Sequence, residues 1–487
     1  MIFQTSLSRS LKRALLALSL ALLCGLATPA SRAQNAPQPR REQLLNGLNV
    51  LIWQRAGDPN VLLKLRIHSG AAFDLAGKAG TIALLGDSLF PDPATREYFT
   101  EDLKGRLEVA TDYDALNITL SGPASEFENI VDLLHTALIK TQPSPEVFAK
   151  LREARSKMLR ETPISPSMVA DRAIAQRLFG DYPYGRPAAG SAETLARIER
   201  GDLIFAQERF SISNNATLVV IGGVAEKRAL KALRQLLGIW RKNNAVVPAT
   251  FRQPEAPDAR TLLIDLPGAE SSEVRLAVRG LSRSDRDYAA ALVLSLLVRD
   301  RWQAAMPELA RSAFFVRHEA HVLPGIFVMG ASVRTAEAGK ALATARGVLR
   351  SLSEAQPSPQ ELERVRAEAL AVFNKQAEQP ETLSELWLDA ETFKLPSITE
   401  QARAIASITP ADIQRVVFRI FRDVPTATVA VGSASELKAT LEGAGPVELL
   451  SERAEPKPAA SEPAKTPANP LMLPVRRPNA PAPVRKP

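Results

Sequence analysis

Short runs of alternating apolar residues, followed by one helical pattern, open the folded part of this chain. Residues 47–53 and 61–69 alternate as strands do, and Gly57-Asp58-Pro59-Asn60 between them is typical of a turn. In the next stretch, residues 80–90, apolar side chains recur at helical spacing. The pattern therefore predicts a hairpin followed by an amphipathic helix.

The order of strands and helices then continues and begins a second time. A second strand pair is predicted at residues 108–112 and 115–121, followed by several helices and an apolar strand at 216–221. Residues 242–259 are rich in Pro, Asn and Ala and have no clear period, which is typical of a linker. Beyond this linker, paired strands and helices return in a similar order.

The two parts match best at their ends. Asn215–Gly222 and Thr426–Gly432 are both apolar strand-like segments that end in glycine and lead into a helix. Duplication of a unit of about 200 residues is the simplest account of this match. We therefore expect an α+β fold with two homologous α/β halves, at residues 42–241 and 260–445, each a mixed sheet backed by helices and joined by the linker 242–259.

The first 33 residues have the composition of a secretory signal. Basic residues precede an apolar run that contains the one cysteine, Cys24, and small residues follow up to Ala33, where cleavage is expected. The run is too short to span a membrane comfortably. We expect an exported protein without a transmembrane span, which in a bacterium would be periplasmic. Residues 454–487, rich in Pro, Ala and basic side chains, are expected to be a disordered tail.

The formal net charge of +8 belongs to these two ends. The signal carries four basic residues and no acid, and the chain from Ala454 onward carries six basic residues against two Glu. The body between them is therefore neutral. A neutral body gives no reason to expect a nucleic-acid groove.

Six segments in a fixed order carry a resemblance to a known family. They are Gly47–Ile52, Leu65–Gly70, Gly80–Phe90, Ala110–Asp114, the loop Tyr182–Gly185 followed by Gly190 and Glu193, and Asn214–Gly223. Over roughly residues 42–442 the chain resembles the pitrilysin/insulinase metallopeptidases, particularly the bacterial exported branch related to mitochondrial processing peptidase. The resemblance implies two pitrilysin-like halves per chain, with four such halves enclosing a chamber in the complete enzyme.

The family's zinc-binding motif, H-x-x-E-H, falls on the predicted helix at residues 80–90. In this register the two ligand positions hold Ala83 and Asp87, and the general-base position holds Gly86. The family's third ligand, a Glu, is expected near Lys157 or Met158, while Glu153 and Glu161 would need a shift in register. Because a zinc site needs three protein ligands, the resemblance implies no metal, no cofactor and no catalytic residue here, although zinc is expected for the family.

The resemblance also places a substrate-polarising Arg and Tyr in the second half of a working enzyme. In this chain Glu308 falls at the Arg position and Phe315 at the Tyr position. Phe315 has no hydroxyl to stabilise an oxyanion. Arg301 and Arg311 lie nearby in the sequence and remain alternatives to the missing Arg.

The predicted strand after the motif helix resembles the family's substrate-binding edge. A peptide added there as an extra strand is held by main-chain hydrogen bonds and needs no catalytic side chain. The candidate substrate-binding residues are Glu108, Val109, Ala110, Thr111 and Asp112. The competing interpretation is an edge covered by a neighbouring helix or a partner.

Several histidines and charged residues offer weaker candidate sites. His318 and His321 are three residues apart on a predicted strand, so they point to opposite faces and do not share a metal. A substitute metal site from His68, Asp74 and Asp87 stays open. The alternative for Asp87 is a solvated carboxylate.

Two further groups have simpler interpretations. His135 lies among apolar residues of a predicted helix, at the edge of a core. The run Arg152, Arg155 and Lys157 is interpreted as a solvated helix face.

Three functions remain open at this point. The leading hypothesis is a non-catalytic periplasmic subunit that forms a heterodimer with an active, zinc-bearing pitrilysin-like paralogue and completes a peptide-degrading chamber. The second is a stand-alone peptide-binding or scaffold protein of the same fold. The third is an active metalloendopeptidase with unorthodox ligands.

Overall fold

The computed structural model describes residues 37–139, 143–244 and 251–450. The predicted signal at 1–33 and the predicted tail at 454–487 lie outside the described residues, as does part of the predicted linker. Within the described part of the chain, no helix combines the length and the apolar character needed to cross a membrane.

The first half is built on a six-stranded mixed sheet. Its strand order is β1-β2-β6-β3-β5-β4, with only the β2–β6 pair parallel. The strands are β1 (Arg40–Gln43), β2 (Asn49–Gln54), β3 (Asn60–Ile67), β4 (Arg106–Thr111), β5 (Leu116–Pro123) and β6 (Ala216–Gly222). The α-helices are α2 (Thr81–Leu89), α3 (Pro93–Glu97), α4 (Phe127–Ile139), α5 (Pro145–Glu161), α6 (Pro166–Phe179), α7 (Ala192–Ala196), α8 (Arg200–Phe210) and α9 (Glu226–Leu236).

The second half repeats this architecture. Its sheet has the order β12-β7-β11-β8-β10-β9, in which β7, β11, β8, β10 and β9 correspond to β2, β6, β3, β5 and β4. The strands are β7 (Thr261–Asp265), β8 (Ser272–Arg279), β9 (Phe314–Glu319), β10 (Ile326–Val333), β11 (Ala427–Gly432) and β12 (Val447–Leu450). The helices are α10 (Tyr288–Ala305), α11 (Ala338–Glu354), α12 (Pro359–Glu378), α13 (Pro380–Phe393), α14 (Ile398–Ala406), α15 (Pro410–Phe421) and α16 (Ala434–Glu442).

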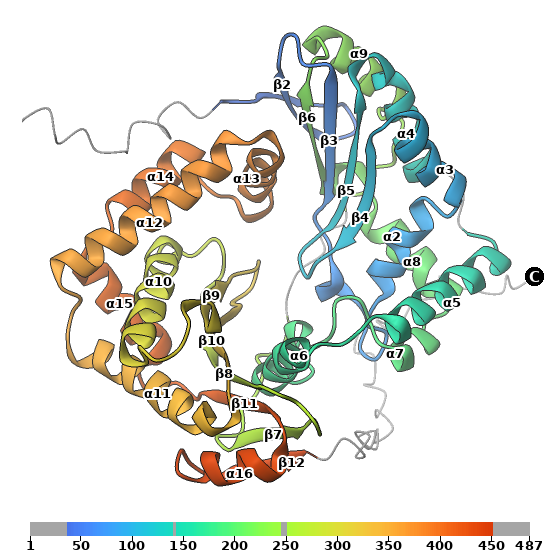
Figure 1. Ribbon diagram of the computed structural model, residues 1–487. Helices are drawn as coiled ribbons and strands as arrows, with labels where there is room; N and C mark the ends of the chain where they lie inside the picture. The colour runs from blue at the N-terminus through green and yellow to red at the C-terminus, as the bar shows by residue number, and fades with distance from the viewer. Residues whose placement is uncertain (1–36, 140–142, 245–250, 451–487) are drawn as a thin grey trace, which may run out of the picture.

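The two halves exchange one helix each. Helix α6 of the first half packs on β8 and β11 of the second sheet, and α13 of the second half packs on β6 and β3 of the first (Figure 1). Trp387 of α13 lies edge-on to Trp53 of β2, with ring centroids 6.1 Å apart. Each sheet is therefore covered by helices on both faces, and one of these covering helices comes from the other half.

A buried cation lies beneath each exchanged helix, in the same strand register. Lys64 of β3 is paired with Val219 and Arg275 of β8 with Val429, each three residues before the glycine that ends the central strand. The Lys64 ammonium lies 2.6 Å from the Glu385 carboxylate of α13. The Arg275 guanidinium lies 2.6 Å from the Asp171 carboxylate of α6. Charge pairing therefore joins the halves at both exchanges.

The predicted fold class is confirmed: two α/β halves with matching mixed sheets backed by helices. The glycine-ended strands that suggested the duplication are β6 and β11, which occupy equivalent central positions. Both strands are fully buried, which explains their continuous apolar sequence. The exact domain boundaries stay a prediction.

Candidate functional site

The motif helix α2 is held firmly at its start. Gly80, which precedes it, has φ +96°, and an added Cβ there would lie 2.9 Å from the Gly190 Cα. The buried Asp74 carboxylate accepts hydrogen bonds from the backbone N–H groups of Gly80 (2.6 Å) and Ile82 (2.9 Å). Burial raises the pKa of Asp74 to about 7, although these hydrogen bonds act in the opposite direction. The helix is fixed by its cap and by its apolar side chains in the core.

The three motif positions on α2 do not carry zinc chemistry. Ala83 is buried, and its methyl side chain has no atom that could coordinate a metal. Gly86 lies against the sheet, where an added Cβ would be 2.9 Å from Leu116 Cδ1 and 3.0 Å from Val109 Cγ1. The general-base position therefore packs closely against side chains of β4 and β5, where a larger residue needs them to shift.

Asp87 forms an ion pair with Arg155 of α5. Arg155 Nε lies 2.6 Å from Asp87 Oδ2, and Arg155 Nη2 lies 3.0 Å from Asp87 Oδ1 and 3.1 Å from the Ala83 carbonyl oxygen. The Arg155 side chain is only 12% exposed. The Arg155 guanidinium thus contacts both Ala83 and Asp87, the positions at which the pitrilysin-type peptidases have zinc ligands. Ala83 and Asp87 therefore do not fit a zinc ion.

This contact corrects two interpretations made from the sequence. Asp87 is not a freely solvated carboxylate, and Arg155 does not belong to a solvated face. Arg152 also turns inward and donates to the Ile198 carbonyl oxygen (3.1 Å). Lys157 is exposed as expected. Nothing in the sequence indicated this role for Arg155, because the family's ligand in this region is a carboxylate and an arginine two residues before Lys157 does not resemble it.

The substitute metal site from His68, Asp74 and Asp87 is wrong. Their side chains have separate partners: Asp74 caps α2, Asp87 binds Arg155, and His68 lies between Thr217 and Thr392. In residues 37–139, 143–244 and 251–450, no three His, Cys, Asp or Glu side chains are grouped so that they could hold a metal ion. Glu153 and Glu161 pair with Arg160 and Lys157 on α5 itself.

His68 joins the first sheet to the exchanged helix α13. The Thr392 hydroxyl donates to the Leu388 carbonyl oxygen (2.7 Å), so it accepts from His68 Nδ1 (3.1 Å). His68 Nε2 then accepts from the Thr217 hydroxyl (3.0 Å), which fixes a neutral tautomer. Burial lowers the pKa of His68 to about 3.

We expect acid to weaken the native state through His68. Its pKa is lower in the folded chain than in the unfolded chain. Its contribution to the free energy of unfolding is therefore complete above about pH 6.5 and is lost as the pH falls towards 3. Between pH 6.5 and 5.5 the loss should approach about 1 kcal/mol. Urea unfolding of the native chain and of His68→Gln at both pH values measures it. An equal acid sensitivity in both proteins would contradict this assignment.

The remaining histidines have separate partners. His318, buried in β9, accepts from the Leu281 N–H through Nε2 (2.9 Å), whereas His321 lies beyond the end of β9 with Nδ1 2.9 Å from Asp114 Oδ2. His135 on α4 contacts the Leu236 carbonyl oxygen at 2.6 Å.

Glu308 and Phe315 are engaged within the second half. Glu308 pairs with Lys340. The Phe315 ring lies over Gly330, and the guanidinium carbons of Arg275 and Arg317 are 4.7 Å and 4.4 Å from its centroid. Phe315 therefore has a packing role between two cations.

The two alternative arginines also have local partners. Arg301 forms a two-point contact with Glu361 (3.0 and 3.2 Å), and the exposed Arg311 lies 3.8 Å from Asp300. Both contacts stay within the second half.

The candidate edge strand is β4, and it pairs only with β5 among the described residues. Glu108, Val109, Ala110 and Thr111 lie on it. Asp112 does not: its carbonyl oxygen accepts from the Ala71 N–H, and its carboxylate accepts from the N–H groups of Asp114 and Ala115. Asp112 therefore closes the β4–β5 turn, because its short carboxylate reaches the backbone two and three residues ahead. The available edge ends at Thr111.

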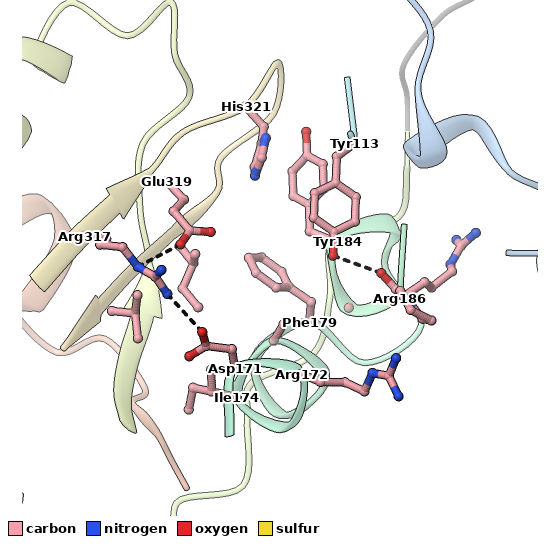
Figure 2. A pocket seen from close by; sticks show the side chains of 15 residues that line it. Tyr113, Asp171, Arg172, Ile174, Phe179, Tyr184, Arg186, Arg317, Glu319 and His321 are labelled. Carbon is pink, nitrogen blue, oxygen red and sulfur yellow. Dashed lines mark hydrogen bonds and ion pairs between the residues drawn. The ribbon is translucent and has the colours of Figure 1, made fainter. Parts of the chain in front are cut away.

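A cavity that the sequence did not predict lies where the halves meet (Figure 2). Its volume is about 310 Å³, and its walls come from α6, the loop at 184–187, the β4–β5 turn and the strands β9 and β10. Tyr184 belongs to the loop Tyr182–Gly185, which in the sequence carried only part of the family resemblance. The two tyrosines of this loop could have suggested an aromatic site, but the residues of β9 and β10 that complete the cavity are far away in the sequence.

Comparison with known proteins gives a family match over part of the chain and one fold. Residues 197–369 match the family model described as the peptidase M16 inactive domain. A search of curated proteins gave no match.

Solved structures match nearly the whole described chain. A protease from Helicobacter pylori (TM-score 0.73, 17% identity) covers 81% of this chain and 99% of its own. The peptidase M16 inactive domain from Pseudomonas fluorescens (TM-score 0.71, 17% identity) covers 81% and 98%. The periplasmic protease PqqL from Escherichia coli (TM-score 0.68, 18% identity) covers 86% of this chain, which matches 52% of PqqL.

At these identities the structural matches establish the fold and leave the activity open. The family model adds a sequence match that crosses from the first half into the second. Both halves of the chain therefore have the fold of M16-like peptidases, and residues 197–369 are similar in sequence to the M16 inactive-domain family.

Proposed function

We propose that this chain is a non-catalytic M16-like subunit that binds peptides and pairs with a zinc-bearing peptidase of the same fold. The ion pair between Arg155 and Asp87 carries the proposal. The motif helix keeps its cap and its packing, while the metal's place is taken by a guanidinium. Such a helix contributes wall surface to a chamber and no bond-breaking group.

The β4 edge supports peptide binding. Its outer main-chain groups have no strand partner in the described part of the chain. The exposed side chains of Arg106 and Glu108 keep the edge polar, as natural proteins do to prevent uncontrolled pairing. A bound peptide strand would therefore use main-chain hydrogen bonds, with selectivity from neighbouring pockets.

Export to the periplasm is part of the proposal. It rests on the signal-like sequence up to Ala33 and agrees with the periplasmic location of PqqL, a structural neighbour. PqqL is about twice as long as the matched part, so a second M16-like chain could supply here what one longer chain contains there.

Pairing is tested by co-expression with an M16 peptidase that carries H-x-x-E-H. We expect a stable complex whose peptidase activity needs both chains, and we expect this chain alone to hold less than about 0.1 equivalent of zinc, because a zinc site needs three protein ligands. Size-exclusion chromatography, metal analysis and peptide hydrolysis measure these results.

One tightly bound zinc per chain would overturn the non-catalytic assignment. A peptidase that works equally well alone would favour the stand-alone peptide-binding function.

A further inference from the structure

The cavity between the halves has an apolar floor. Ile174 and Phe179 of α6 face Ile326 and Val328 of β10, and three of these four side chains, all but Ile326, are at most 3% exposed. Its volume of about 310 Å³ is at the lower end for ligand sites, so it suits one bulky residue rather than a long ligand.

Three aromatic rings form a fixed wall above this floor. The ring centroids of Tyr113, Tyr184 and His321 are 4.5 to 5.3 Å apart. Their polar atoms are already bonded: the Tyr113 hydroxyl donates to the Arg186 carbonyl oxygen, the Tyr184 hydroxyl accepts from the Leu323 N–H, and His321 contacts Asp114. The wall therefore offers ring surface and little further hydrogen bonding.

The charged side chains around the cavity lie on two sides of it. On one side, Asp171 lies between Arg275 (2.6 Å) and Arg317 (3.3 Å), and Glu319 lies 3.1 Å from Arg317. The acids on this side are therefore neutralised, as the dashed contacts in Figure 2 show for Arg317.

Two guanidinium groups lie on the other side, and carboxylates act on them only without direct contact: Glu193 on Arg172, and Asp74 and Asp181 on Arg186. Arg172 and Arg186 line the cavity beside Phe179 and Tyr184 (Figure 2). Within the described residues neither forms an ion pair, and Arg186 donates only to the carbonyl oxygens of Asp74 and Asp181. Two guanidinium groups without an ion pair, beside an apolar floor, are complementary to a group that is both anionic and apolar.

A larger groove adjoins the cavity at these arginines. Its volume is about 1410 Å³, and it shares Arg172, Phe179, Gly185, Arg186 and Pro187 with the cavity. It continues along the apolar side chains of α6 and β7. A chain whose last residue enters the cavity thus has a path by which the preceding residues leave.

We propose that the cavity binds the C-terminal residue of a peptide, with the terminal carboxylate at Arg172 and Arg186 and a large apolar side chain on the floor. This site is separate from the β4 edge and needs no second subunit. It would make the protein selective for peptides with a free, apolar C-terminus.

Three capped dipeptides test the site on the purified chain by isothermal titration calorimetry. N-acetyl-leucyl-phenylalanine with a free carboxylate should bind at least tenfold more tightly than its C-terminal amide and than N-acetyl-glycyl-glycine. Arg172→Gln should weaken the free acid at least fivefold and leave the amide unchanged. The control Arg160→Gln, on the exposed face of α5, should change neither.

Equal binding of acid and amide would overturn the proposal, as would no binding of the free acid at millimolar concentration. Arg172 is the decisive position, because it is exposed and its side chain forms no hydrogen bond or ion pair within the described residues. Arg186→Gln gives a second test, with its folding checked by thermal unfolding, since its guanidinium also bonds two backbone carbonyls. Neither result depends on whether the chain pairs with a peptidase.

Discussion

Replacement of Arg275 by Met should destabilise the protein by about 3 kcal/mol or more. Arg275 is 0% exposed and bonds Asp171, Glu273 and Ser167 at 2.6 to 2.9 Å. Methionine fills the space but leaves the buried carboxylate of Glu273 without its cation. Because two of the lost contacts lead to α6, the variant should also loosen the junction between the halves.

Urea unfolding measures this loss as a lower midpoint of the first transition. The matched control is Arg160→Met, which removes an exposed ion pair with Glu153 and should cost less than about 0.5 kcal/mol. The double variant Glu273→Gln/Arg275→Met should recover part of the stability, since it removes the orphaned charge. If Arg275→Met and Arg160→Met unfold at the same urea concentration, the exchanged helix is not held by this charge pairing.

Restoring the zinc motif should fail while Arg155 remains. The triple variant Ala83→His, Gly86→Glu, Asp87→His supplies two ligands and a base, but the guanidinium stays beside them. At about 4 Å and an effective dielectric constant of 20, a unit positive charge opposes each charge of a zinc ion by about 4 kcal/mol. Adding Arg155→Glu removes this charge and supplies a third ligand, so zinc affinity should rise at least 100-fold over the triple variant.

Competition with a fluorescent zinc chelator measures these affinities. Arg155→Ala in the triple variant separates the removal of charge from the supply of a ligand, and should give an intermediate affinity. Arg160→Glu in the same background is the control, because it adds a carboxylate at an exposed site of α5. A triple variant that binds zinc as tightly as the quadruple one would show that Arg155 is no obstacle. Gly86→Glu also requires the side chains of Leu116 and Val109 to shift, so folding is checked first.

Local patterns in the sequence were sufficient for the fold class and for the loss of the motif. The glycine-ended apolar strands β6 and β11 indicated the duplication, because a strand buried on both faces has a continuous apolar sequence. The helical spacing around Ile82 predicted the helix, and the resemblance to the family placed Ala83, Gly86 and Asp87 at its motif positions. These features depend on residues close together in the chain.

The partners of those residues could not be inferred in this way. Arg155 was interpreted as part of a solvated face, since helical spacing shows which residues share a face but not what lies opposite. Asp112 was assigned to the edge strand, yet it turns into the hairpin. The cavity was not foreseen at all, because Tyr184 and Val328 meet only after α6 crosses to the other sheet.

The sequence by itself determined two α/β halves, a packed motif helix and the absence of the family's ligand types at Ala83, Gly86 and Asp87. Only the tertiary structure decided the contacts between distant segments: the Arg155–Asp87 ion pair, the exchange of α6 and α13, and the cavity lined by Arg172 and Arg186. The physical reason is that strand and helix periodicity is local, whereas a charge pair or a cavity depends on elements that are far apart in the chain and are brought together by packing.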